Sequence, residues 1–112
     1  MVEVPPDSVS RFSSNSSYNV QEQAGPHLWF LILNLKEGTF KNKQVRKAVN
    51  HAINKKSLVE NVLKNTATVA TGPTPAAFAW AYNESLDPYP YNPDKARQMI
   101  KDAGFAGSTL TF

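Results

Sequence analysis

Histidine is the side chain that most readily serves acid–base or metal chemistry at neutral pH. This sequence has two, His27 and His51, together with many serines. A serine–histidine–aspartate site requires a base held against a nucleophile by a third group, and no spacing in the chain indicates such a set. Zinc sites use cysteines or closely spaced histidines, whereas the sequence has no cysteine and no His-x3-His pair. We therefore expect no catalytic residues, no metal site and no cofactor.

The position of His51 on a predicted helix indicates which way its side chain faces. Apolar residues recur at helical spacing on one stripe, at Val45, Ala48, Val49, Ala52 and Ile53. At about 100° per residue, His51 lies about 130° around the helix from the Val45/Val49 stripe. We therefore expect His51 to face solvent, and His27, at the entrance of a predicted strand, to be a surface residue as well.

Basic side chains gather in one part of the chain. The formal charge is +3, but residues 36–64 carry eight Lys or Arg against two Glu, whereas residues 1–35 and 65–112 are slightly acidic. The Lys/Arg-rich helix pair 43–64 could neutralise phosphates as a small basic nucleic-acid-binding domain. The segment between the two helices lacks the glycine that is usual in a helix-turn-helix motif. The second helix exposes mainly Glu60, Asn61 and Lys64, which are poorly suited to contacting base edges. Nucleic-acid binding is the alternative, and solvated lysines are the favoured interpretation.

Length and composition indicate one globular domain. The 112 residues match the usual size of a single domain, so we expect residues 1–112 to form one. With 41% hydrophobic and 19% charged residues, the chain is too apolar for a disordered one. The longest apolar run has six residues, against about 20 for a membrane span. Residues 1–6 lack the basic and apolar segments of a signal peptide, so we expect none there.

Apolar patterns predict strands in three places. Residues 18–22 alternate large and polar side chains, which is typical of a strand with one solvated face. Residues 28–33 are uniformly apolar, which is typical of a central strand covered on both faces. Residues 109–112 begin as a strand and stop, which suggests a piece of a longer protein. Adjacent strand residues point to opposite faces, so by this argument at most one of Trp29 and Phe30 packs in the chain's own core. The alternative, favoured by the general burial preference of aromatic residues, is that both are core residues.

Helices are predicted in the remaining segments. A short one follows Asp7, and another covers residues 45–53. A capping box of Ser57 and Glu60 predicts a helix over residues 57–63. Asn92 before Pro93 predicts a helix that ends just before residue 104. The predicted fold class is therefore α/β, a mixed β-sheet with about three helices packed on it.

A set of motifs in a fixed order resembles family 5 extracellular solute-binding proteins, the dipeptide and oligopeptide group of bacterial ABC importers. The matching residues are Leu33-Asn34, Phe40, Val45-Arg46-Lys47-Ala48, Ala52-Ile53-Asn54, Gly72-Pro73-Thr74-Pro75, Trp80-Ala81-Tyr82, Tyr91-Asn92-Pro93-Asp94-Lys95-Ala96, Ala103-Gly104-Phe105 and residues 109–112. The chain departs from the family pattern at Asn42, at Asn54 and at Gly38-Thr39. These departures affect the subfamily more than the family.

The resemblance implies a fold, a function and candidate site residues. It implies part of the second large lobe of a periplasmic-binding-protein-like receptor of the type II, peptide-binding cluster, which closes two lobes over its ligand by hinge motion. It implies a periplasmic or extracellular location, a membrane permease as partner, and a dipeptide, oligopeptide, metal chelate or sugar as ligand. Trp29, Phe30, Trp80 and Tyr82 are the candidates to line the ligand site. An uncovered apolar segment further predicts that the chain alone forms a homodimer.

Overall fold

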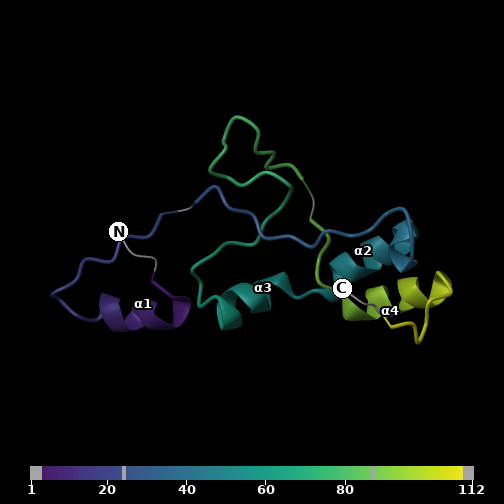
Figure 1. The fold of residues 1–112 in the computed structure, drawn as a ribbon, viewed down its shortest axis with the longest axis horizontal. Coiled ribbons are helices and arrows are strands. Elements are labelled where there is room, and N and C mark those ends of the chain that lie inside the picture. The colour runs from purple at the N-terminus through teal and green to yellow at the C-terminus, as the bar shows by residue number, and fades with distance from the viewer. Residues whose placement is uncertain (1–3, 24, 87, 110–112) are drawn as a thin grey trace. The chain divides into compact units, whose positions relative to one another are not determined.

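The computed structural model describes residues 4–23, 25–86 and 88–109, and every regular element in these ranges is a helix (Figure 1). In chain order the elements are α1 (Pro6–Ser13), the 3-10 turn η1 (Thr39–Lys41), α2 (Lys43–Ala52), α3 (Lys55–Ser57), the π-helical turn η2 (Leu58–Val62) and α4 (Pro93–Asp102). No helix among the described residues has the length and apolar character needed to cross a membrane.

The predicted mixed β-sheet is wrong. Residues 18–22 and 28–33 form no strand, and most of the predicted strand at 109–112 lies outside the described residues. An apolar pattern indicates where the backbone can extend, but a strand exists only when a neighbouring backbone accepts its N–H and C=O groups. No described segment pairs with residues 28–33. Trp29 and Ile32 are accordingly 91% and 84% exposed.

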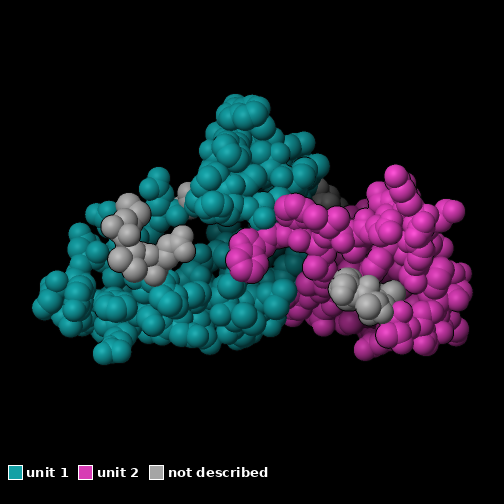
Figure 2. All heavy atoms as spheres, viewed as in Figure 1, with its two compact units in different colours: residues 1–28, 55–86 teal, residues 29–54, 87–112 magenta. Residues whose placement is uncertain are grey.

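The chain divides into two compact units (Figure 2). Unit 1 comprises Met1–Leu28 and Lys55–Leu86, and unit 2 comprises Trp29–Asn54 and Asp87–Phe112. Unit 2 holds all five buried side chains of the described residues, which are Phe40, Val45, Ala48, His51 and Ala96. The core therefore lies between α2 and α4, which pack against each other.

Two asparagines set the first turns of the core helices. The side chain of Asn42 accepts from the backbone N–H of Gln44 at 2.8 Å, where α2 begins. The side chain of Asn92 accepts from the backbone N–H of Lys95 at 2.9 Å, with proline as the first residue of α4. Gly104 lies just past the end of α4 with φ +78°, a left-handed conformation that glycine adopts without strain. The predictions for these two helices are confirmed.

Helical structure in unit 1 differs in detail from the prediction. α1 begins at Pro6, so Asp7 lies in its first turn and does not cap it. The capping box does not form, because Ser57 has helical dihedral angles and Glu60 instead faces Lys56 at 3.6 Å. After η2, Lys64 and Asn65 take positive φ angles of 49° and 63° and turn the chain out of the helix.

The loop over residues 72–86 of unit 1 is closed by its own side chains. The hydroxyl groups of Thr71 and Tyr82 are 3.1 Å apart and form a hydrogen bond. Leu86 packs on Gly72 so closely that a Cβ there would come within 2.5 Å of its Cδ1. Trp80 nevertheless remains 87% exposed, so the aromatic residues of the loop do not all pack down.

Candidate functional site

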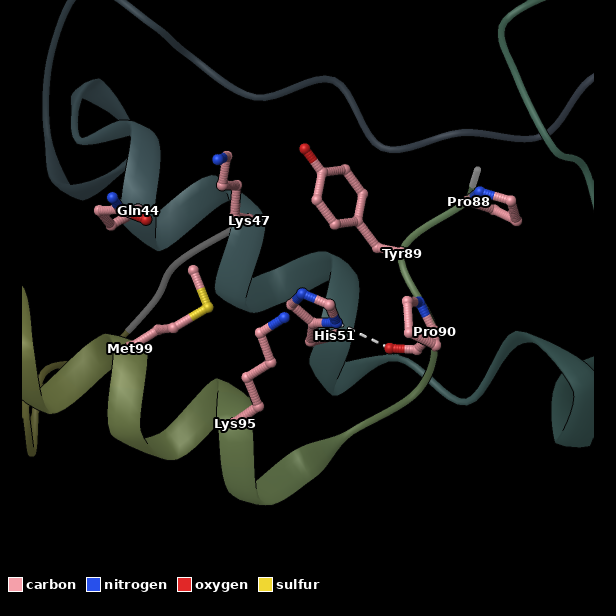
Figure 3. A pocket seen from close by; sticks show the side chains of 8 residues that line it. All are labelled: Gln44, Lys47, His51, Pro88, Tyr89, Pro90, Lys95 and Met99. Carbon is pink, nitrogen blue, oxygen red and sulfur yellow. Dashed lines mark hydrogen bonds between the residues drawn. The ribbon is translucent and has the colours of Figure 1, made fainter. Parts of the chain in front are cut away.

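A cavity with a volume of about 370 Å³ lies in unit 2 (Figure 3). Three segments line it. α2 contributes Gln44, Lys47 and His51, the segment before α4 contributes Pro88, Tyr89 and Pro90, and α4 contributes Lys95 and Met99. The packing of α2 on α4 therefore forms the cavity, which needs no residue of unit 1.

His51 joins the end of α2 to the segment that leads into α4. It is only 3% exposed, and its Nδ1 lies 2.7 Å from the carbonyl oxygen of Pro90. Its own carbonyl oxygen accepts from the backbone N–H of Asn92 at 2.8 Å. The imidazole also meets the ring of Tyr89 edge-on, with centroids 5.3 Å apart and an angle of 85° between the rings. These contacts fix the wall of the cavity at that point.

The expectation that His51 faces solvent is wrong. The residues of α2 that are buried are Val45, Ala48 and His51, at i, i+3 and i+6. This face is rotated toward His51 relative to the predicted stripe, and Ala52, which the stripe included, is exposed. The small side chains of Ala48 on α2 and Ala96 on α4 are both buried, so the two helices approach closely along this flank. The position of α4 therefore determines which face of α2 is buried, and the number of apolar residues on a face does not determine it alone.

The hydrogen bond to Pro90 determines which nitrogen of the neutral His51 ring carries the proton. A carbonyl oxygen can only accept, so Nδ1 donates and Nε2 holds a lone pair. No fully buried side-chain nitrogen or oxygen among the described residues lacks a partner, so Nε2 is open to solvent through the cavity. In Figure 3 the side chain of Lys95 reaches from α4 toward this ring.

Among the residues that the structure describes, positively charged side chains and no carboxylates line the cavity. Lys47 and Lys95 are the charged members of this described lining, and Gln44 and the Tyr89 hydroxyl add polar groups. The ion pairs of the described residues join Lys56 to Glu60 and Arg97 to Asp94, so neither cavity lysine is neutralised by them. No group of three or more His, Asp or Glu side chains that could hold a metal ion occurs in the described ranges. The arrangement can bind a polar ligand, but it has no base held against a nucleophile.

The four aromatic candidates for lining a ligand site do not lie in this cavity. Trp29 and Phe30 belong to unit 2 and are 91% and 69% exposed, so neither is a core residue. Trp80 and Tyr82 belong to unit 1. Trp80 is 87% exposed, whereas Tyr82 is half-buried, with its hydroxyl bonded to Thr71.

The sequence analysis did not predict the cavity, although a signal for it exists. Gln44, Lys47 and His51 follow helical spacing at i, i+3 and i+7, so they share one face of α2. Lys95 and Met99, at i and i+4, share a face of α4 in the same way. A lysine on each of these two faces, on helices expected to pack together, would have indicated this site.

Comparison with known proteins decides the family. The family model described as bacterial extracellular solute-binding proteins, family 5 middle, matches residues 1–112. The chain belongs to this family. The family predicted from the ordered motifs is therefore confirmed.

Two relatives show how far the similarity extends. Heme-binding protein A of Haemophilus influenzae is 32% identical over 97 residues, which cover 87% of this chain and 18% of that protein. Glutathione-binding protein GsiB of Shigella flexneri is 38% identical over 95 residues, which cover 83% of this chain and 18% of that protein. The family 5 chain described here thus spans less than a fifth of the length of these relatives. Neither comparison favours the nucleic-acid alternative.

Proposed function

We propose that this chain is part of the solute-binding component of a bacterial ABC importer and takes no part in catalysis. The family model that matches all of residues 1–112 carries this proposal. The described lining of the cavity in unit 2, with two lysines, a glutamine and a tyrosine hydroxyl around His51, agrees with a binding role. In this function the whole receptor closes two lobes over its solute and delivers it to a membrane permease, in the periplasm or at the cell surface.

The solute is proposed to be a peptide or another small molecule with peptide-like groups. The names of two relatives support a small organic ligand, because one is a glutathione-binding protein and the other a heme-binding protein. Trp29, Phe30, Trp80 and Tyr82 are proposed to line the site in the whole receptor. The high exposure of Trp29, Phe30 and Trp80 supports this role, because these rings are free to contact a ligand or another part of the receptor.

Isothermal titration of the intact receptor against a dipeptide and tripeptide library, glutathione and heme tests the proposed function. A dissociation constant near ~1 μM for one of these solutes is expected of a closed, preorganised cleft. The 112-residue chain alone should bind the same solute no better than about 1 mM, because affinity depends on contacts that converge from both lobes. Tight binding of duplex DNA with a steep salt dependence, and of no solute, would contradict the proposal in favour of a nucleic-acid protein.

The separated chain is also proposed to form a homodimer through the exposed apolar segment around Trp29 and Ile32. These two side chains are 91% and 84% exposed, and they adjoin further exposed apolar residues at Phe30 and Leu31. Contiguous apolar surface of this kind is unfavourable in water, and a second copy of the chain supplies a matching apolar surface.

A further inference from the structure

The cavity between α2 and α4 presents a charge balance that selects an anion. Lys47 and Lys95 line it, and no acidic side chain in the described part of the chain does. Neither lysine takes part in the ion pairs of the described residues. Two ammonium groups at one cavity raise the local concentration of anions and give up to three N–H donors each.

His51 adds a hydrogen-bond acceptor that distinguishes anions with an O–H group from anions without one. Because Nδ1 donates to the Pro90 carbonyl, Nε2 of the neutral ring is an acceptor that opens on the cavity. Figure 3 shows the Lys95 side chain directed toward the same ring. A ligand that satisfies both residues therefore offers oxygens that accept from an ammonium group and one O–H that donates to Nε2.

We propose that this cavity is a binding site for hydrogen phosphate. At neutral pH this ion carries two negative charges and one O–H group, so its oxygens accept from Lys47 and Lys95 while its O–H donates to Nε2 of His51. Sulfate carries the same charge on a similar tetrahedral frame but has no O–H to donate. The amide of Gln44 and the hydroxyl of Tyr89 also line the cavity and supply further donors. The site does not depend on which solute the whole receptor transports.

The size of the cavity sets the expected affinity. Its volume of about 370 Å³ exceeds that of one tetrahedral ion, so water fills the remainder. Lysine stems are flexible, and ordering them on the ion opposes binding. We expect a dissociation constant of about 1 mM, which amounts to roughly 4 kcal/mol of binding free energy.

Nuclear magnetic resonance titration of the ¹⁵N-labelled chain with sodium phosphate, sodium sulfate and sodium chloride at equal ionic strength tests the proposal. Phosphate should give saturating shifts of amides in residues 44–51 and 88–99. Sulfate should bind at least about threefold more weakly, because one hydrogen bond is lost. Phosphate should also shift the ¹⁵N resonance of His51 Nε2 while the Nδ1 resonance stays that of a protonated nitrogen. Equal affinity for sulfate and phosphate, or shifts that grow linearly with all three salts, would overturn the proposal.

Two variants that remove the same charge distinguish binding at the cavity from a general attraction of the anion to the net positive charge. Lys95→Gln should weaken phosphate binding by about fivefold or more, since it removes one charge-assisted contact. Lys101→Gln removes the same charge from an exposed position on the same helix and should leave the affinity unchanged. Equal loss in both variants would show that the ion senses only net charge. The absence of saturating phosphate binding by the wild-type chain would refute the proposal.

Discussion

Replacement of His51 by alanine directly tests how α2 and α4 are held together. The side chain is 3% exposed, donates to the Pro90 carbonyl at 2.7 Å and meets the Tyr89 ring edge-on. Loss of the hydrogen bond costs about 1 kcal/mol, because Pro90 is exposed and water can reach its carbonyl. Loss of the ring contact costs about 1 kcal/mol more, and the better helix propensity of alanine returns about 0.5 kcal/mol. We expect His51→Ala to lower the free energy of unfolding by about 1.5 kcal/mol.

Urea unfolding followed by circular dichroism measures this loss as a lower midpoint at an unchanged slope. Asn50→Ala is the matched control, because Asn50 is a half-buried neighbour whose side-chain hydrogen bond, to the Arg46 carbonyl at 3.1 Å, lies within α2. It should change the free energy of unfolding by less than about 0.5 kcal/mol. His51→Phe retains the ring but not the donor, so it should lose about 1 kcal/mol. We call the contacts of His51 with Pro90 and Tyr89 the His51 clasp. If His51→Ala and Asn50→Ala were equally stable, this clasp would not exist and His51 would be solvated.

Three further outcomes follow from local geometry. Asn92→Ala should lower the free energy of unfolding by about 1 kcal/mol in urea melts, because the Asn92 side chain accepts from the Lys95 N–H at 2.9 Å, and Asn92→Ser should recover most of the loss. Lys64→Gly should raise it by about 0.5–1 kcal/mol, because φ of +49° strains a residue with a Cβ; a destabilised variant would contradict that backbone geometry. Trp29→Ser should weaken the proposed dimer in sedimentation velocity across a concentration series, and a wild-type chain that stays monomeric at every concentration would refute it.

The helices of unit 2 could be predicted because their signals are local. Asn92 followed by Pro93 indicates where α4 begins, and Gly104, which adopts a left-handed conformation, indicates where it has ended. Asn42 and the apolar repeat beginning at Val45 do the same for α2. A helix cap or a helical repeat involves residues within one or two turns of each other. It can therefore be identified from the sequence without knowledge of the rest of the fold.

The absence of strands from the described residues could not be foreseen, because a strand depends on backbone partners that are distant in the sequence. Residues 28–33 have the apolar side chains of a buried strand, yet the described residues give them no neighbour for their backbone groups. Their pattern therefore indicates only that these residues form an apolar surface. The same limit applies to His51, whose burial depends on where α4 packs and not on its own helix.

The His51 clasp and the proposed anion site share one imidazole, which couples stability to binding. Nδ1 of His51 holds the Pro90 carbonyl, and Nε2 opens on the cavity beside Lys95. An ion that donates its O–H to Nε2 keeps the ring in the tautomer that Pro90 requires, and it binds only when α2 and α4 are packed. Any ligand that binds the folded chain alone raises the free energy of unfolding, by about 1.4 kcal/mol at ten times its dissociation constant. Phosphate should therefore raise the urea midpoint of the wild-type chain. At the same phosphate concentration the gain should fall to about 0.9 kcal/mol in His51→Phe, because the loss of the Nε2 acceptor weakens binding about threefold.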